Sequence, residues 1–324
     1  MLDFGILLLP GAHGTSVSAT LDLLGAAALI APGLGVPAPR WQVYSPSGGS
    51  VTLSQGLAVR SRRLPVRLPS GRPTWVVPGL GVTSARRADT LMQTPDAQAL
   101  VRWLQRVAAQ GSPLAASCSG VLALAEAGVL QGRRATTAWW LAPLLRQRAP
   151  GADVDERRMV IEDGPVVTAG AAFAQADLML WLLRRRFGQP LSEAVARALL
   201  VDGRPLQAPY IDPAVLHSGH ELLARVEAEV RAMLPRAPSV QALAHALSMS
   251  PRTLARRVRS ASGRSPLALI QSVRLAAART LLEASALPVD EVAHRVGYAD
   301  PTALRRLLKK AWGVAPRQMR RPGA

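Results

Sequence analysis

The chain is poor in cysteine, with a single one, Cys118, among its 324 residues. One cysteine excludes an intrachain disulfide, in keeping with a reducing cytosol. Long apolar runs are also lacking, because Asp22, Pro32, Gln175 and Asp177 interrupt the most hydrophobic stretches. We find no run of the roughly 18 apolar residues that span a bilayer, and the N-terminus lacks the basic flank of a signal peptide. We therefore expect a cytoplasmic, nucleoid-associated protein with no membrane partner.

Acidic residues are outnumbered, with 21 Asp and Glu against 39 Lys and Arg and a formal net charge of +18. The excess is uneven: residues 236–324 carry 16 basic and 4 acidic residues (+12), and residues 1–235 carry 23 and 17 (+6). A strongly basic C-terminal part attracts polyanions, and nucleic acid is the first candidate partner. A merely solvated, arginine-rich surface is the alternative interpretation.

The first half of the chain alternates short apolar runs with segments of helical periodicity. We predict strands at residues 4–9, 41–45, 74–77 and 113–116, helices at 18–30, 96–109 and 172–187, and a hairpin of 159–162 with 165–168. Strands that alternate with helices indicate a largely parallel sheet covered on both faces. Residues 1–200 are therefore predicted to form an α/β domain.

The strand pattern does not continue beyond this domain. Residues 201–213 are rich in Pro, Gly and polar residues, which predicts an interdomain linker. Later apolar patterns are helical, with helices predicted at residues 213–233, 240–247, 251–260, 266–284, 289–296 and 301–312. Residues 214–324 are therefore predicted to form an all-α domain.

The all-α part contains an internal near-repeat, residues 243–256 and 292–305. Each copy has an apolar residue followed by Ala on a short helix, then a tight turn, then Pro, Thr and Leu at the start of a basic helix. Ser250 and Asp300 are suited to cap the two basic helices, and Pro suits the first helical turn. This is the arrangement of a helix-turn-helix, used twice.

Each basic helix separates an apolar face from a charged face. Leu254 and Val258 are predicted to point inward from the first, and Leu304, Leu308 and Ala311 from the second. The residues left outside, which we predict to contact DNA, are Arg252, Arg256, Arg259, Thr302, Arg305, Arg306, Lys309 and Lys310.

The helix predicted at residues 266–284 separates these two basic helices. Its predicted inward stripe is Ile270, Val273, Ala277 and Leu281. At about 1.5 Å per residue it spans roughly 28 Å. That length would hold the basic helices about one DNA turn apart, roughly 34 Å.

The C-terminal residues resemble the AraC/XylS family of transcription regulators. The matching residues are Gly263-Arg264-Ser265-Pro266, Arg274-Leu275, Ala278, Leu281-Leu282, Val292-Ala293, Gly297-Tyr298, Gly313, Pro316 and Arg320. Val258, Leu304 and Leu308 are aliphatic where the family often has Phe. The resemblance implies a regulator of double-stranded DNA in which Arg256, Thr302 and Arg306 occupy base-contacting positions. RNA polymerase is a further candidate partner.

A strand-turn-helix elbow is predicted at residues 113–120, with Cys118 at its turn. Upstream, a strand ends in Gly79-Leu80-Gly81, beside which an oxyanion or carboxylate could sit. Together with Arg134-Ala135-Thr136-Thr137, Val167-Thr168-Ala169-Gly170 and Asp177, these features resemble the PfpI-type, glutamine-amidotransferase-like domain of GlxA-related regulators. The resemblance implies a flavodoxin-like, amidotransferase-type fold for residues 1–200.

Catalysis at Cys118 would need a base and an orienting group. Enzymes of this fold often have His directly after the Cys, where this chain has Ser119, and the GlxA-like pattern has His where Ala138-Trp139 follows the paired Thr. The acidic residue that lowers the thiol pKa in some relatives is absent around Pro10-Gly11. His13, the only His before position 217, is the one candidate base. We predict a protein that is not an enzyme and has no cofactor or metal.

Ligands of open α/β sheets bind outside the carboxyl ends of the strands. The candidate ligand-binding residues at that edge are His13, Gly79, Leu80, Cys118, Ser119, Thr137, Trp139 and Trp140. The tryptophans could contact a cationic or apolar effector, such as an amino acid or amine metabolite, or could pack in the core or at a dimer interface. The helix that begins at Gly120 points the positive end of its dipole at the Cys118 sulfur, which could lower the pKa of the thiol even without catalysis.

Three functions fit the sequence, and we favour the first. It is a ligand-responsive transcription regulator, homodimeric through residues 1–200, with an inactive amidotransferase-like sensor; activation and repression both fit. The second is a Cys-dependent amidase or protease fused to a DNA-binding domain, which the missing base argues against. The third is a constitutive DNA-binding protein whose N-terminal half only dimerises.

Overall fold

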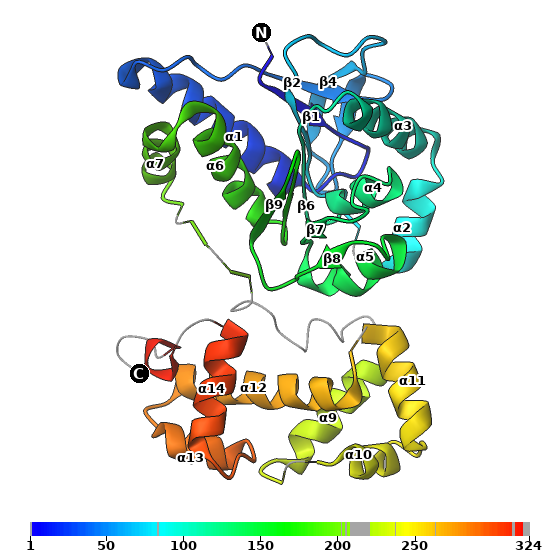
Figure 1. Ribbon diagram of the computed structural model, residues 1–324, viewed down its shortest axis with the longest axis vertical. Helices are drawn as coiled ribbons and strands as arrows, with labels where there is room; N and C mark the ends of the chain where they lie inside the picture. The colour runs from blue at the N-terminus through cyan, green and yellow to red at the C-terminus, as the bar shows by residue number, and fades with distance from the viewer. Residues whose placement is uncertain are drawn as a thin grey trace. The chain divides into compact units, whose positions relative to one another are not determined.

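The computed structural model describes residues 2–82, 84–201, 203–204, 206–207, 221–236, 238–262, 264–312 and 315–319. The chain divides into two compact units, Met1–Gln207 and Ala208–Ala324, each with its own packed core (Figure 1). Most of the predicted linker at 201–213, the first residues of the helix predicted at 213–233, and the motif residues Gly263, Gly313 and Arg320 lie outside the described residues.

The first unit is built on an eight-stranded sheet in the order β3-β4-β2-β1-β5-β6-β10-β9. Its strands are β1 (Phe4–Leu7), β2 (Trp41–Ser45), β3 (Gly49–Thr52), β4 (Ala58–Arg63), β5 (Thr74–Val77), β6 (Leu114–Ser117), β9 (Val160–Asp163) and β10 (Val166–Ala169). Each neighbouring pair in the central run β4-β2-β1-β5-β6-β10 is parallel. The edge strands β3 and β9 pair antiparallel with β4 and β10. The central order β2-β1-β5-β6-β10 is the 2-1-3-4-5 order of flavodoxin-like folds, so the predicted α/β architecture is confirmed.

The apolar composition of the central strands explains their burial on both faces. Strands β1, β5, β6 and β10 are buried along their whole length. In β1, Leu7 belongs to the core that also contains residues of α3 and α4, whereas Phe4 and Ile6 belong to the core that contains residues of α1, α6 and α7. Near-continuous apolar runs of this kind are typical of parallel strands between two helical layers.

Helices cover both faces of the sheet (Figure 1). One layer consists of α1 (Gly14–Ile30), α6 (Ala174–Phe187) and α7 (Gln189–Ala198), and the other of α2 (Ala85–Met92), α3 (Pro95–Ala109), α4 (Gly120–Glu126) and α5 (Ala142–Arg148). Strands β3 and β4, helices α2, α5 and α7, and the short ladder of β7 (Arg134–Ala135) with β8 (Asp153–Val154) were missed, because they are short, polar or both.

Helix α1 differs from its prediction in two respects. It begins at Gly14 rather than residue 18, and the Gly14 N–H donates to Gln55 Oε1 at 2.8 Å. Among the described residues, Gly14–Leu34 is the one helical stretch whose length and composition would allow it to cross a membrane, although the sequence was expected to contain none. Its Val17, Leu24 and Ala27 pack in the core with α6 and α7, so the stretch serves as a core helix of this unit.

The described part of the second unit is helical, as predicted. Its helices are α9 (Glu221–Met233), α10 (Val240–Ala246), α11 (Pro251–Ser262), α12 (Pro266–Ala284), α13 (Val289–Arg295) and α14 (Pro301–Trp312), followed by the 3-10 turn η4 (Pro316–Met319). Both predicted caps are present: Ser250 Oγ accepts from the Thr253 N–H at 3.1 Å, and Asp300 Oδ1 accepts from the Thr302 N–H at 2.7 Å.

Helix α12 buries different residues than predicted in its second half. Ile270 and Val273 are buried as expected, but Ala278 and Leu282 are buried further along in place of Ala277 and Leu281, which are only partly buried. In its first half, Leu269, Ile270 and Val273 pack with residues of α9 and α11, and α12 also contacts α13 and α14. A single stripe therefore does not serve both sets of neighbours.

Candidate functional site

Cys118 occupies a sharp turn between β6 and α4, which confirms the predicted elbow. Its φ is +51°, in the left-handed region that non-glycine residues rarely adopt. The turn is tight because a Cβ at Gly120 would lie 2.4 Å from the Val77 carbonyl oxygen and 2.5 Å from that of Pro78. Only glycine permits this approach of α4 to the end of β5.

The backbone of Cys118 is fixed on both sides. Its N–H donates to the Gly170 carbonyl at 2.7 Å, and its carbonyl accepts from Thr137 Oγ1 at 2.7 Å. The side chain is 6% exposed and packs with Ala138 and Leu141. The elbow is therefore a well-ordered and nearly closed site.

Burial raises the pKa of the Cys118 thiol to about 11, from an ordinary value of 9.0, and hydrogen bonds with Ser119 oppose this shift only in part. The shift is opposite in direction to the one that the dipole of α4 could produce, because burial disfavours the charged thiolate. The thiol is protonated at neutral pH.

At the glycine-rich turn after β5, where an oxyanion or carboxylate was predicted to sit, amide groups are bonded within the chain. The Leu80 N–H donates to Ser119 Oγ at 2.8 Å, and the Val82 N–H approaches the same oxygen at 3.4 Å. Ser119 itself is 1% exposed. The position predicted for an oxyanion or carboxylate is therefore occupied by the hydroxyl of this chain's own Ser119.

His13 and Cys118 come to the same end of the sheet. A Cβ built at Gly79 would lie 3.4 Å from the Cβ of His13 and 3.5 Å from that of Cys118, so both side chains flank this glycine. The Nδ1 atom of His13 is buried and has no hydrogen-bond partner among the described residues. The two residues thus meet at the β1–β5 switch in strand order, where flavodoxin-like folds bind ligands.

The two tryptophans differ in their surroundings. Trp139 is 6% exposed and belongs to the interior, as the alternative interpretation allowed. Trp140 is half-buried, packs against the cluster that contains Cys118, and meets Trp139 edge-on at 5.2 Å. Trp140 is therefore the aromatic side chain available to a ligand near the elbow.

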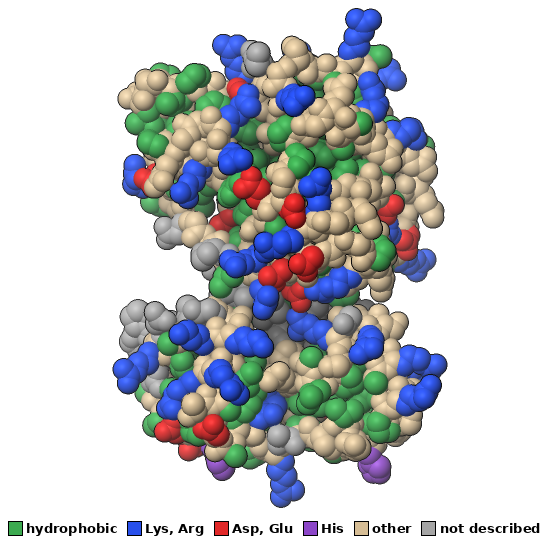
Figure 2. Space-filling model, viewed as in Figure 1, with side chains coloured by type: hydrophobic (Ala, Val, Ile, Leu, Met, Phe, Trp, Pro, Cys, Tyr) green, Lys and Arg blue, Asp and Glu red, His purple; other side chains and the backbone are tan. Residues whose placement is uncertain are grey.

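The first basic helix, α11, presents the predicted cationic face. Arg252, Arg256 and Arg259 are exposed, while Leu254 and Val258 are fully buried on the opposite side. The exposed side lines a hollow of about 680 Å³. Figure 2 shows basic side chains distributed over the surface of this helical unit.

The second basic helix, α14, has a similar face with one internal restraint. Its exposed residues are Thr302, Arg305, Arg306, Lys309 and Lys310. Leu304 and Leu308 are fully buried, and Ala311 is partly buried. Arg305 Nη2 lies 2.5 Å from Asp290 Oδ1 of α13, so this guanidinium is paired within the unit.

Arg274 fixes the second helix-turn-helix to α12. Its Nε donates to the Val296 carbonyl at 2.8 Å and its Nη2 to the Gly297 carbonyl at 2.6 Å. The guanidinium also lies 3.8 Å from the ring centre of Tyr298, in a cation–π contact. Arg274, noted in the sequence only as part of a family motif, is therefore a structural residue of the turn.

Both units match known proteins. Residues 82–185 match the DJ-1/PfpI family, and residues 243–322 match a helix-turn-helix domain. The HTH-type transcriptional regulator GlxA of Rhizobium meliloti is 28% identical over 227 residues, which cover 67% of this chain and 68% of the relative. The HTH-type transcriptional regulator CdhR of Pseudomonas aeruginosa is 29% identical over 225 residues, covering 68% and 67%.

The chain combines an AraC-type helix-turn-helix domain with a DJ-1/PfpI domain, and it is a DNA-binding transcription regulator. Its fold is also found in solved structures. An AraC family transcriptional regulator from Pseudomonas putida has a TM-score of 0.52 at 23% identity, covering 61% of this chain and 100% of that one. A ThiJ/PfpI family protein from Pseudomonas syringae has a TM-score of 0.51 at 19% identity, covering 83% and 91%.

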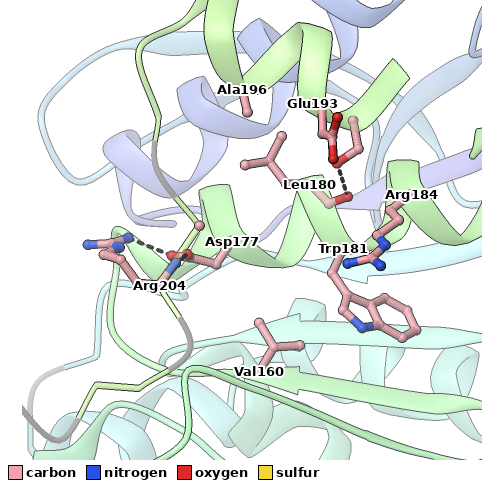
Figure 3. A pocket seen from close by; sticks show the side chains of 10 residues that line it. Val160, Asp177, Leu180, Trp181, Arg184, Glu193, Ala196 and Arg204 are labelled. Atoms are coloured by element: carbon pink, nitrogen blue, oxygen red, sulfur yellow. Dashed lines mark hydrogen bonds and ion pairs between the residues drawn. The ribbon is translucent and has the colours of Figure 1, made fainter. Parts of the chain in front are cut away.

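The DJ-1/PfpI domain of this regulator has a further cavity that the sequence did not indicate. It has a volume of about 450 Å³ and lies on the outer side of α6, between α7, β9 and the residues Gly203 and Arg204 (Figure 3). Trp181, Arg184 and Glu193 line it. At one end, Arg204 Nη2 forms an ion pair with Asp177 Oδ2 at 2.6 Å.

Sequence reasoning also missed Gln207, which is 2% exposed and contacts the segment next to the elbow. It stands alone in a stretch of Pro, Gly and polar residues without periodicity. Its partners, Thr137 and Arg158, are far away in sequence. No local pattern could have revealed this contact.

Proposed function

We propose that this AraC-type regulator controls transcription in response to a small molecule bound at the elbow edge of its DJ-1/PfpI domain, and that this domain is not an enzyme. The proposal that the domain is not an enzyme rests on the protonated state of the Cys118 thiol. A nucleophilic cysteine acts as a thiolate. With a pKa of about 11, roughly one thiol in ten thousand is ionised at pH 7.

The surroundings of the thiol also argue against catalysis. A nucleophile of this kind is activated by a base within hydrogen-bond reach. His13, the candidate base, has no hydrogen-bond partner at Nδ1 among the described residues. The Leu80 amide, a natural donor to a developing oxyanion, is already bonded to Ser119.

The same features suit a binding site. A buried, unpartnered His13 Nδ1 is a hydrogen-bonding group that a ligand could satisfy. Trp140 supplies a half-buried aromatic ring that packs against the cluster containing Cys118. We infer an effector of the amino-acid or amine class, because such molecules combine hydrogen-bonding groups with a cation that an aromatic face attracts.

In the helical unit, we assign base contacts to Arg256, Thr302 and Arg306, with Arg252 and Arg305 beside them. Arg259, Lys309 and Lys310 are assigned to phosphates. All of these side chains are exposed. We further infer a cytoplasmic, nucleoid-associated homodimer that pairs through residues 1–200 and contacts RNA polymerase. Sedimentation of residues 1–207 tests the dimer: a single monomeric species at micromolar concentration contradicts it.

The deciding experiment separates a sensor from an enzyme. Amidase and peptidase turnover of the purified protein is measured for wild type and Cys118→Ser, together with operator occupancy against effector dose. We expect no turnover, specific DNA binding by both proteins without effector, and a shifted effector concentration in the variant. Turnover that Cys118→Ser abolishes would establish the competing function, a Cys-dependent amidase or protease joined to a DNA-binding unit.

The effector is sought by thermal denaturation of the full chain with a panel of amino acids and amines. A ligand that binds only the folded protein raises the unfolding midpoint as its concentration increases. If the N-terminal half serves only for dimerisation, no member of the panel changes the midpoint.

A further inference from the structure

The described residues that end the α/β unit, Gly203, Arg204, Leu206 and Gln207, form a segment that we call the strap. The boundary between the two units falls directly after Gln207. The strap is therefore the last described part of the α/β unit before the helical unit begins. The strap is bonded to the α/β unit at two places.

The first attachment is the side chain of Gln207, which is inserted into the unit. Its Nε2 lies 2.8 Å from the Thr137 carbonyl, 3.1 Å from Thr136 Oγ1 and 3.1 Å from the Arg158 carbonyl. The Gln207 N–H donates to the Arg157 carbonyl at 2.9 Å, and Leu206 forms an antiparallel bridge with Arg158.

The second attachment is Arg204. Its N–H donates to Asp177 Oδ1 at 2.8 Å, and its Nη2 donates to Asp177 Oδ2 at 2.6 Å (Figure 3). The Nη2 also donates to the Phe173 carbonyl at 2.8 Å. The Asp177 side chain is 4% exposed, so this ion pair has one buried partner. Breaking it would leave a buried carboxylate without its cation, which is costly.

Gln207 contacts the groups that hold Cys118 from both sides. Thr137, whose carbonyl accepts from Gln207, donates through Oγ1 to the Cys118 carbonyl. Gly170, whose carbonyl accepts from the Cys118 N–H, packs so closely on Gln207 that a Cβ at this glycine would lie 2.5 Å from Gln207 Oε1. One side chain of the strap therefore contacts Thr137 and Gly170, two of the residues that hydrogen-bond to the Cys118 backbone.

We propose that Gln207 is a positioning residue of the elbow and that it links occupancy of the elbow site to release of the strap, and so to the helical unit. A ligand or bulky group that displaces Thr137 or Gly170 removes acceptors from the Gln207 amide. Because an unpaired buried amide costs free energy, the strap then favours the detached state. Such a link is reciprocal, so loss of Gln207 must loosen the elbow. The proposal rests on the proposed sensor function for its biological meaning, but its physical test needs no effector.

The first test places a group at the elbow and observes the strap. Cys118 is the only cysteine, so prolonged treatment of the full chain with iodoacetamide at mildly alkaline pH labels one site. We expect hydrogen exchange of the Arg204 and Gln207 amides to accelerate at least tenfold, while the amides of β1 and β5 keep their protection. Unchanged exchange at these two amides overturns the proposal.

The second test runs in the opposite direction and covers the case in which labelling unfolds the unit. Gln207→Met keeps a side chain of similar length but removes both donors. We expect Cys118 in this variant to react with iodoacetamide at least five times faster than in wild type at the same pH. Gln105→Met, at an exposed position of α3, serves as the matched control and should react at the wild-type rate. Equal rates in Gln207→Met and wild type overturn the proposal.

A failure of the link and a failure of the sensor function give different results. If the exchange and alkylation rates respond but no amino acid or amine raises the unfolding midpoint, the strap proposal stands and the effector class is wrong. If a metabolite binds and shifts operator occupancy equally in wild type and Gln207→Met, the sensor function stands and the strap does not transmit it.

Discussion

The elbow of the α/β unit and the basic helices of the helical unit differ in how they use polar side chains. Ser119 and Thr137 at the elbow are 1% and 0% exposed, and both hydrogen-bond to backbone. Arg256 of α11 and Lys310 of α14 are exposed. A buried polar group is fixed by its partners and responds to packing, whereas an exposed cation keeps its charge and can meet a phosphate. A change at the elbow should therefore affect stability and ionisation, and a change on the basic helices should affect DNA affinity.

The largest expected effect is on stability at the elbow. In Gly120→Ala the new methyl group would meet the carbonyl oxygens of Val77 and Pro78 at 2.4 and 2.5 Å, and rigid backbone cannot yield as a flexible side chain can. We expect the free energy of unfolding to fall by about 3 kcal/mol or more. Urea denaturation followed by tryptophan fluorescence reports on this unit, which holds six of the seven tryptophans.

The control for that substitution is Gly25→Ala in α1, where an added Cβ meets nothing within 4 Å. Alanine in a helix is favoured over glycine by up to about 1 kcal/mol, so this variant should be as stable as wild type or more so. Equal destabilisation by the two substitutions would mean that the elbow is not the tight point of the fold.

The next effect is a pH dependence of stability at the elbow. The Cys118 thiol has a pKa of about 11 in the folded protein and 9.0 ordinarily, because burial disfavours the thiolate. The folded state holds this proton more tightly, so the unfolded state ionises first as the pH rises. The stability linked to the thiol is fully present below pH 9 and is lost between about pH 9 and 11, by roughly 3 kcal/mol in total.

The measurement is the free energy of unfolding of wild type minus that of Cys118→Ser, at intervals from pH 8 to 11. Taking the difference cancels the titration of other groups, which both proteins share. We expect the difference to decrease as the pH rises. A difference that is flat over this range would show that the thiol ionises equally well in both states.

The third prediction concerns DNA binding by the basic helices. Arg256→Ala removes an exposed guanidinium from α11 and leaves the core residues Leu254 and Val258 in place. We expect the affinity for a duplex selected from random sequences to fall by about 1–3 kcal/mol, with relaxed preference at one base position. The unfolding midpoint should not change. Arg225→Ala, at an exposed site of α9, is the control and should bind as wild type does.

The same contrast explains what could be predicted from the sequence. Helices α12 and α14 begin and end where expected, because Pro266 and Pro301 mark their first turns and an apolar period of 3.6 follows. The elbow was found because small residues must flank a strained turn. The exposed cations are likewise predictable, because each lies on the side of its helix opposite the apolar face.

What the sequence could not supply depends on contacts between distant segments. The raised pKa of Cys118 results from burial by several elements, and the local helix dipole alone predicts the wrong direction. Gln207 and Arg204 acquire their roles from Thr137 and Asp177, which lie on other elements of the unit. The shift of the buried stripe in α12 likewise depends on which helices pack against each half.

The smallest expected effect is that of Lys310→Ala, a loss of one exposed cation near the end of α14. A lysine placed against a phosphate acts as a point charge and releases about one counterion on binding, without reading a base. The affinity should therefore fall by less than in Arg256→Ala, and similarly for selected and random duplexes. The slope of log affinity against log salt should flatten by about 1. The affinity and the slope are both measured by fluorescence anisotropy titration of the two duplexes at salt concentrations between about 50 and 200 mM. A loss confined to the selected duplex would mean that Lys310 contacts a base, and the assignment of exposed cations to phosphates would have to be revised.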